Sequence, residues 1–192
     1  MPKERSNTIK EQQKRVGIGT VKKLDILENQ AKIVYLGIGS NLGDRKKNIE
    51  IAKSYLGENN LDFLSISSFY ETPSWPNPKN PKFLNIVIKA KFYFDPESLL
   101  KICKSIEMLL GRKKNKKNAP RICDIDIIDF DQKGLNIKNK LTLPHKLMHK
   151  RNFVLIPFFE IQKNWHHPII KKDLKSLISS LSQSDIRSIK QI

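Results

Sequence analysis

Apolar residues follow two different spacings along this chain, and the spacing predicts which segments are strands and which are helices. Segment 33–38 is a short apolar run rich in β-branched residues, which is typical of a buried strand. In segment 122–130 apolar and acidic residues alternate, as expected of a strand with one buried face. By these criteria we predict strands at residues 33–38, 61–72, 83–94 and 122–130.

Two longer segments carry apolar residues at helical spacing and have recognisable ends. The ends are clearer for the segment that starts near residue 96. Asp95 suits its N-cap, Pro96 suits its first helical position and Gly111 suits its C-terminal end. The first is bounded in the same way by Asp44 and Gly57. We therefore predict helices at 45–56 and 96–110, and short helices at 153–161 and 174–181.

From residue 33 onward the predicted order is β-α-β-β-α-β. That order is typical of the ferredoxin-like α+β fold, in which helices pack on an antiparallel sheet. A turn at Lys133-Gly134, with extended residues around it, adds a C-terminal hairpin, and the short helices follow. We expect residues 31–192 to form a single domain and residues 1–30 a basic, flexible or helical extension outside its core.

Composition narrows the classes of protein that fit. The chain has 192 residues, and an apolar content of 39% is enough for a buried core. No apolar run approaches the roughly 18 residues that a membrane span needs. The two cysteines, Cys103 and Cys123, exclude a disulfide framework and a four-ligand cysteine zinc site. The N-terminus lacks a signal-peptide pattern, so we expect a protein of the reducing cytoplasm with no membrane partner.

The chain is strongly basic, since 36 Lys and Arg against 19 Asp and Glu give a net charge of +17. Nucleic acid, anionic membranes and phosphorylated small molecules are the partners that such a charge favours. The lysines are spread along the whole chain, so a general compositional bias is a second explanation. The denser segment 112–121 is either a phosphate-binding loop or a solvated surface loop.

Asp124 and Asp126 are the strongest chemical signal. A step of two residues on a strand places both carboxylates on one face, a few ångströms apart. Two carboxylates that close repel each other unless a cation lies between them, and Mg²⁺ binds one or two carboxylates together with substrate phosphates. A solvent-facing strand is the alternative, but the preceding basic loop favours a metal site. We predict that Asp129 and Asp131 are ordinary surface acids near the strand end.

Other motifs are excluded or weak. The glycines of loop 37–43 do not have the spacing of the dinucleotide fingerprint, and no P-loop sequence occurs. The histidine pair 166–167 lacks acid or cysteine companions at metal-ligand spacing. Phe83 and Asn85 share a strand face beside a proline-rich segment. That pairing suits a flat, hydrogen-bonding heterocycle, although a phenylalanine on a strand is usually core.

Several short motifs occur in a definite order along the chain. They are YLGIGSNLGD at 35–44, SSFYETP at 67–73, FLN at 83–85, Ile106-Glu107 with Gly111-Arg112, Pro120-Arg121 with DIDI at 124–127, LPH at 143–145, and Arg151 with Phe153. In this order they resemble the family of 6-hydroxymethyl-7,8-dihydropterin pyrophosphokinases of folate biosynthesis. The resemblance runs from about Ile33 to about Pro168, which is most of the chain.

The resemblance implies the ferredoxin-like core predicted above and a specific reaction. The hydroxymethyl oxygen of the pterin attacks the β-phosphorus of ATP, a pyrophosphoryl group is transferred, and AMP leaves. Two Mg²⁺ ions bridge the phosphates to Asp124 and Asp126. Residues 31–192 would then be one pyrophosphokinase domain with ATP as co-substrate. We expect a monomer whose partners are ATP and 6-hydroxymethyl-7,8-dihydropterin.

The resemblance also implies roles for particular residues of this sequence. The catalytic set comprises two basic residues and the acidic pair: Arg121, Lys117, Asp124 and Asp126. The pterin is contacted by hydrogen-bonding groups, aromatic walls and a proline–tryptophan segment: Thr72, Asn85, Phe83, Phe153, Pro73 and Trp75. ATP is contacted by Glu107, Lys114, Lys117, Arg121, Ile127, Lys140, Thr142, His145 and Arg151.

The chain departs from the family pattern in the basic loop. Asn118-Ala119 stands in place of the usual Trp-Gly, and Lys114 and Lys117 stand in place of arginines. An RNA-binding ferredoxin-like domain is a different class that fits the charge, but the aromatic-rich strand of such domains is missing. The two aspartates would also repel RNA phosphates, so we do not expect nucleic acid as a partner. A scaffold role for extension 1–30 stays open.

Overall fold

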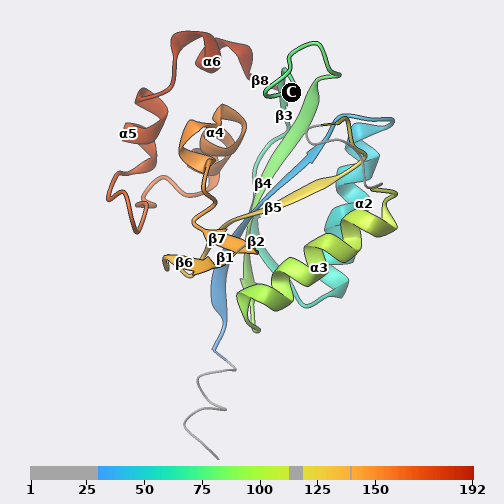
Figure 1. Ribbon diagram of the computed structural model, residues 1–192, viewed down its shortest axis with the longest axis vertical. Coiled ribbons are helices and arrows are strands. Elements are labelled where there is room, and N and C mark those ends of the chain that lie inside the picture. The colour runs from blue at the N-terminus through green and yellow to red at the C-terminus, as the bar shows by residue number, and fades with distance from the viewer. Residues whose placement is uncertain (1–29, 113–118, 139) are drawn as a thin grey trace, which may run out of the picture. The chain divides into compact units, whose positions relative to one another are not determined.

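The computed structural model of the protein describes residues 30–112, 119–138 and 140–192 (Figure 1). The chain divides into the units Met1–Gln30 and Ala31–Ile192, and the fold described below is that of the second. The predicted extension lies outside the described residues apart from its last residue, and so do Lys114 and Lys117. Within the described part of the chain, no helix is long and apolar enough to cross a membrane.

An antiparallel sheet lies at the centre of this unit. Its strands are β1 (Lys32–Ser40), β2 (Asp62–Ile66), β3 (Tyr70–Thr72), β4 (Phe83–Phe92), β5 (Asp124–Phe130) and β8 (Lys190–Gln191). They are hydrogen-bonded in the order β5–β1–β4–β3–β8, and β2 also pairs with β4. Every described pair in this sheet is antiparallel, as the sequence predicted. The central strands β1 and β4 pair along almost their whole length, from Lys32 opposite Phe92 to Ser40 opposite Leu84.

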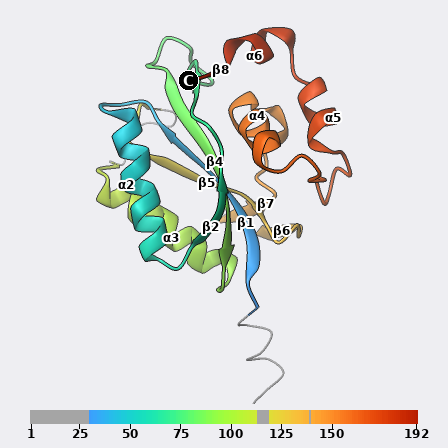
Figure 2. The ribbon, with the colours of Figure 1, turned by 180° about the vertical axis from the view of Figure 1, so that it is seen from behind.

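Helices cover both faces of the sheet. They are α2 (Arg45–Glu58), α3 (Pro96–Leu109), α4 (Asn152–Ile161), α5 (Leu174–Ser179) and α6 (Gln183–Ser188). Figures 1 and 2 show α2 and α3 on one face and the other three on the opposite side. The predicted N-caps start both long helices, because the carboxylates of Asp44 and Asp95 accept N–H groups of the first turn. A hairpin is present, as strands β6 (Leu135–Ile137) and β7 (Leu141–Leu143), but both strands follow Lys133-Gly134, so the predicted turn is not the one that joins them.

Two hydrophobic cores lie on the two faces of the sheet. Alternate residues of a strand point to opposite faces. Val34 and Leu36 of β1 therefore pack in the core with α2 and α3, whereas Tyr35 packs in the core with α4 and α5. Because this central strand is buried on both faces, its sequence is almost continuously apolar, which explains the run at 33–38.

The predicted strand 61–72 is two strands rather than one. Between β2 and β3, the Ser67 N–H donates to the Val87 carbonyl at 2.9 Å, and the Ser67 hydroxyl accepts the Val87 N–H at 2.9 Å. A side-chain oxygen thus replaces a backbone carbonyl in the ladder, which apolar spacing does not reveal. The other predicted elements are present with ends within two residues of the prediction, and α6 and β8 are additional.

The prediction that Asp129 is a surface acid is wrong, because Asp129 is fully buried. The β1–β5 ladder pairs Tyr35 with Asp129 but Leu36 with Ile127, so β5 carries one extra residue, Ile128. This bulge turns Asp129 to the face on which Tyr35 lies. There the Trp165 Nε1–H donates to Asp129 Oδ2 at 3.3 Å.

Candidate active site

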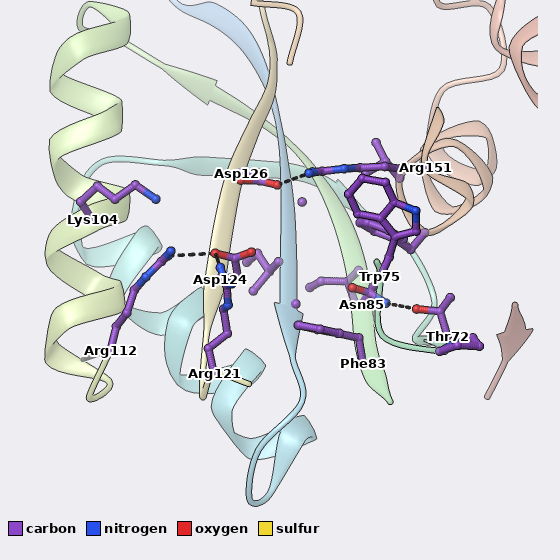
Figure 3. A pocket seen from close by; sticks show the side chains of 17 residues that line it. Thr72, Trp75, Phe83, Asn85, Lys104, Arg112, Arg121, Asp124, Asp126 and Arg151 are labelled. Carbon is purple, nitrogen blue, oxygen red and sulfur yellow. Dashed lines mark hydrogen bonds and ion pairs between the residues drawn. The ribbon is translucent and has the colours of Figure 1, made fainter. Parts of the chain in front are cut away.

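Residues that are far apart in the sequence meet around a cavity of about 210 Å³ (Figure 3). Strands β1, β3, β4 and β5 and helices α3 and α4 all contribute lining residues, from Gly37 to Val154. All six residues assigned to the pterin line this cavity: Thr72, Pro73, Trp75, Phe83, Asn85 and Phe153. Four of the residues assigned to catalysis, metal or ATP also line it: Arg121, Asp124, Asp126 and Arg151.

The acidic pair faces this cavity from strand β5. Asp124 Oδ1 accepts hydrogen bonds from Arg112 Nη1 at 2.8 Å and from Arg121 Nη1 at 2.9 Å. Asp126 Oδ2 accepts one from Arg151 Nη1 at 2.9 Å. Burial works to raise the pKa of Asp124, but the charges of Arg121 and Arg112 outweigh it and hold that pKa below its usual value. Asp124 is therefore a carboxylate at neutral pH.

This pair has the chemistry of a site for a hard divalent cation. Hydrogen bonds from the described residues reach one oxygen of each carboxylate, Asp124 Oδ1 and Asp126 Oδ2. As far as the described residues go, the other two oxygens, Asp124 Oδ2 and Asp126 Oδ1, can serve as metal ligands. Among the described residues there is no group of three or more His, Cys, Asp or Glu that could hold a metal. A set of two carboxylates fits Mg²⁺, which completes its coordination with water and phosphate oxygens.

Another part of the cavity presents hydrogen-bonding groups beside an aromatic ring. Asn85 Nδ2 donates to Thr72 Oγ1 at 3.0 Å, and both residues are buried. A Cβ at position 39 would lie 2.9 Å from Asn85 Oδ1 and 3.2 Å from the Phe83 ring, so Gly39 leaves these two side chains the space they occupy. The cavity therefore offers an amide, a hydroxyl and a ring edge in fixed positions.

Arg151 connects the aromatic and the acidic parts of the cavity. Its guanidinium is bonded to Asp126 and lies over the Trp75 ring, 5.6 Å from the ring centroid (Figure 3). It also lies over the Phe153 ring, 5.5 Å from that centroid. Cation–π attraction and the ion pair both hold the guanidinium in this place. A ligand that stacked on these rings would have to compete with Arg151.

A second cavity of about 280 Å³ adjoins the first, and Lys104 and Asp126 line both. Four residues assigned to ATP line this second cavity: Ile127, Lys140, Thr142 and His145. Burial lowers the pKa of His145 despite the Asp126 carboxylate, whose Oδ2 lies 3.9 Å from His145 Nε2. His145 is therefore a neutral hydrogen-bonding group near pH 7 rather than a cation.

Glu107, which the resemblance assigns to ATP, is surrounded by protein groups in this structure. It is fully buried and lines neither cavity. Its Oε1 accepts the N–H of Ile125, between the two aspartates, at 2.8 Å. Its carboxylate also forms ion pairs with Lys104 and Arg112. In this structure Glu107 therefore contacts the protein groups that line the cavities, and its own carboxylate is not open to them.

Lys104 and Arg112 line the first cavity as well. The sequence assigns no role to Lys104, and Arg112 occurs there in the basic loop and in the motif with Gly111 but without a role of its own. The signal for Lys104 was its position three residues before Glu107 on a predicted helix, because side chains at that spacing share a face. Lys114 and Lys117, which the resemblance assigns to the phosphates, lie outside the described residues.

Comparison with known proteins decides the family. A family model described as 7,8-dihydro-6-hydroxymethylpterin-pyrophosphokinase (HPPK) matches residues 35–163. The chain belongs to the HPPK family. One relative is the 2-amino-4-hydroxy-6-hydroxymethyldihydropteridine pyrophosphokinase of Aquifex aeolicus, 42% identical over 142 residues that cover 74% of this chain and 88% of that HPPK. The protein of the same name from Methylorubrum extorquens is 35% identical over 129 residues, which cover 66% and 80%.

Longer proteins also match this chain over part of their length. The bifunctional protein FolKE of Lactococcus lactis is 34% identical over 160 residues, which cover 82% of this chain and 45% of FolKE. Among solved structures, wild-type HPPK-DHPS of Plasmodium falciparum with pterin and p-hydroxybenzoate matches with a TM-score of 0.68 at 18% identity, over 85% of this chain and 47% of that one. This structural match shows a shared fold alone, and the chain spans less than half of these longer proteins.

Proposed function

We propose that this protein transfers pyrophosphate from ATP to 6-hydroxymethyl-7,8-dihydropterin and forms AMP and the pterin diphosphate, a step of folate biosynthesis. The observation that carries the proposal is one cavity with two kinds of lining: a carboxylate pair among arginines, and a buried amide and hydroxyl among aromatic rings. The family description and the names of the two shorter relatives refer to the same reaction.

The aromatic part of the cavity is the pterin site in this proposal. Phe83 and Phe153 stack on the flat heterocycle. Asn85 and Thr72 hydrogen-bond to its edge, where an amide suits a ring that presents donors and acceptors side by side. The segment before β4 completes the wall with Pro73 and Trp75.

The acidic part of the cavity is the phosphate site. Asp124 and Asp126 hold two Mg²⁺ ions through the oxygens that receive no hydrogen bond from the described residues. When bound, these ions would supply positive charge that offsets the charge of the phosphate chain. Arginines that now bond the aspartates, Arg121 and Arg151 among them, then turn to phosphate oxygens, and Lys114 and Lys117 belong to the same phosphate-contacting set.

The second cavity takes the nucleoside of ATP, where Ile127, Lys140, Thr142 and His145 contact it. The phosphate chain then runs from the second cavity into the first. The hydroxymethyl oxygen forms a bond to the β-phosphorus and loses its proton to solvent. The bond from the β-phosphorus to the oxygen that bridges it to the α-phosphorus breaks, and AMP leaves with that oxygen. The protein contributes by holding both substrates in line and by placing cations around the developing charge.

We also propose a domain organisation, an oligomeric state and a compartment for the enzyme. Residues 31–192 form one catalytic domain with a ferredoxin-like core, which the order of elements and the strand order β5–β1–β4 with β2 and β3 support. Residues 1–30 are an extension outside it. In this proposal the enzyme works as a monomer in the cytoplasm, and a chain with only two cysteines and no disulfide framework suits that reducing compartment.

A direct assay tests the function. The protein is incubated with MgATP, with and without 6-hydroxymethyl-7,8-dihydropterin, and AMP and the pterin diphosphate are separated by chromatography. We expect equal amounts of the two products, formed only when the pterin is present. Release of ADP in place of AMP, or no pterin-dependent product, would refute the proposal.

A further inference from the structure

The junction of the two cavities is the place that a bound ATP must cross. Among the described residues, Lys104 and Asp126 are the two that line both cavities. A nucleoside in the second cavity and a β-phosphorus in the first require the phosphate chain to pass between them. Of these two residues, Lys104 is the one whose positive charge suits a direct contact with phosphate oxygens.

Lys104 is held in position by a buried acid. In Figure 3 its side chain extends from α3 toward strand β5. Its Nζ lies 3.1 Å from Oε1 and 3.0 Å from Oε2 of Glu107. Glu107 is fully buried and is itself anchored by the N–H of Ile125 at 2.8 Å. The ion pair with a buried, anchored carboxylate therefore favours one location for the ammonium group.

The Lys104 ammonium still has capacity for a ligand. It carries three N–H donors, and the two oxygens of Glu107 engage at most two of them. Its side chain is 47% exposed, whereas Glu107 has no exposed surface. The cavity arginines differ, because Arg112, Arg121 and Arg151 bond the oxygens of the aspartate pair. Lys104 can thus meet a phosphate without leaving its partner.

We propose that Lys104 contacts the phosphate chain of bound ATP at the junction, and that Glu107 is a positioning residue that holds Lys104 there. This inference rests on the proposed function, because it takes ATP as the substrate. It assigns Glu107 an indirect role, through Lys104, in place of a direct contact with the nucleotide.

Steady-state kinetics of Lys104→Met provide the first test. Methionine keeps the helix-forming, unbranched side chain of α3 but removes the charge. We expect kcat/KM for ATP to fall about tenfold or more, because a charge-assisted contact to the phosphates is lost, and Lys104→Arg to restore part of it. Lys101→Met is the matched control: it lies one turn earlier on α3, is exposed, and lines neither cavity. Equal effects of the two methionine variants would overturn the proposal.

Equilibrium binding separates a phosphate contact from a nucleoside contact. Dissociation constants for ATP and for adenosine are measured by calorimetry on the wild-type protein and on Lys104→Met. We expect ATP to bind about tenfold more weakly to the variant and adenosine to bind within twofold of wild type. The assignment would be contradicted if the variant bound ATP and adenosine more weakly by the same factor, or if it bound both as tightly as the wild type does. This readout needs no pterin, so it decides the role of Lys104 even if the transfer assay fails.

The positioning role of Glu107 is tested by a double-mutant cycle. Glu107→Gln keeps an acceptor for the N–H of Ile125 but loses the charge that holds Lys104. We expect it to weaken ATP binding in the wild-type background and to add little in the Lys104→Met background, since coupled residues are non-additive. Additive effects would refute the coupling. The unfolding temperature of each variant shows whether a loss of folding, rather than of position, explains the change.

Discussion

Asp129 is a fully buried acid, and its charge should make the folded chain less stable as the pH rises. Its Oδ2 accepts hydrogen bonds from Trp165 Nε1 at 3.3 Å and from the Gln132 N–H at 3.2 Å. Its Oδ1 is buried and has no hydrogen-bond partner among the described residues. Burial raises the pKa of this carboxyl from its usual 3.8 to about 6, and these hydrogen bonds oppose the rise only in part. We predict that Asp129→Asn removes a pH-dependent loss of stability.

The magnitude follows from the difference between the folded and unfolded pKa. Between pH 3.8 and about pH 6 the folded chain keeps the Asp129 proton and the unfolded chain releases it, so wild-type stability falls as pH rises through this window. A difference of about two pKa units corresponds to about 3 kcal/mol. Integration from pH 4.5 to pH 7.5 captures about 2 kcal/mol of this, because the window begins below that range.

The assay is urea unfolding at pH 4.5, 6.0 and 7.5 at one ionic strength, with the free energy of unfolding extrapolated for each protein. An asparagine at position 129 keeps an acceptor for Trp165 but places an unpaired amide N–H where Oδ1 lies, which costs stability at every pH. The readout is therefore the wild-type value minus the variant value. We expect this difference to fall by about 2 kcal/mol across the range. The contributions of titratable groups that both proteins share cancel in this difference.

Asp131→Asn is the matched control, because Asp131 is partly exposed and paired with Lys133 at 2.6 Å. Its difference from wild type should not show the fall expected for Asp129. A difference for Asp129→Asn that stayed constant within about 0.5 kcal/mol would refute the reasoning. It would mean that the folded protein stabilises the charged Asp129 carboxylate as well as water does.

Four further outcomes are expected. Replacing Asp124 or Asp126 with alanine should abolish AMP formation while circular dichroism stays native, because the proposed Mg²⁺ site would lose a fixed ligand. Asn85→Ala should raise KM for the pterin about tenfold or more, with KM for ATP little changed, in steady-state assays. Arg121→Ala should lower kcat on the order of 10²-fold, by loss of transition-state charge stabilisation. Deletion of residues 1–30 should leave kcat within a few-fold, and a collapse of activity in a folded truncation would contradict this.

Local patterns in the sequence determined most of the secondary structure. Asp44 and Asp95 start helices because their carboxylates meet N–H groups only two or three residues away. Asp124 and Asp126 both point into the cavity because side chains two residues apart lie on the same face of a strand. These features depend on neighbours in the chain, so the chain order alone predicts them. The order of motifs likewise indicated the family that the comparisons establish.

Only the tertiary structure decided what surrounds each of these groups. A bulge in the β1–β5 ladder turns Asp129 inward beside Trp165, 36 residues away along the chain. Glu107 is buried because α3 packs against β5, where it meets the Ile125 N–H. Lys104 became a site residue because two cavities meet beside it. The periodicity of the sequence shows which residues share a face of a strand or helix, but not which other elements pack against that face. The burial of a side chain, its pKa and its access to a ligand depend on those elements.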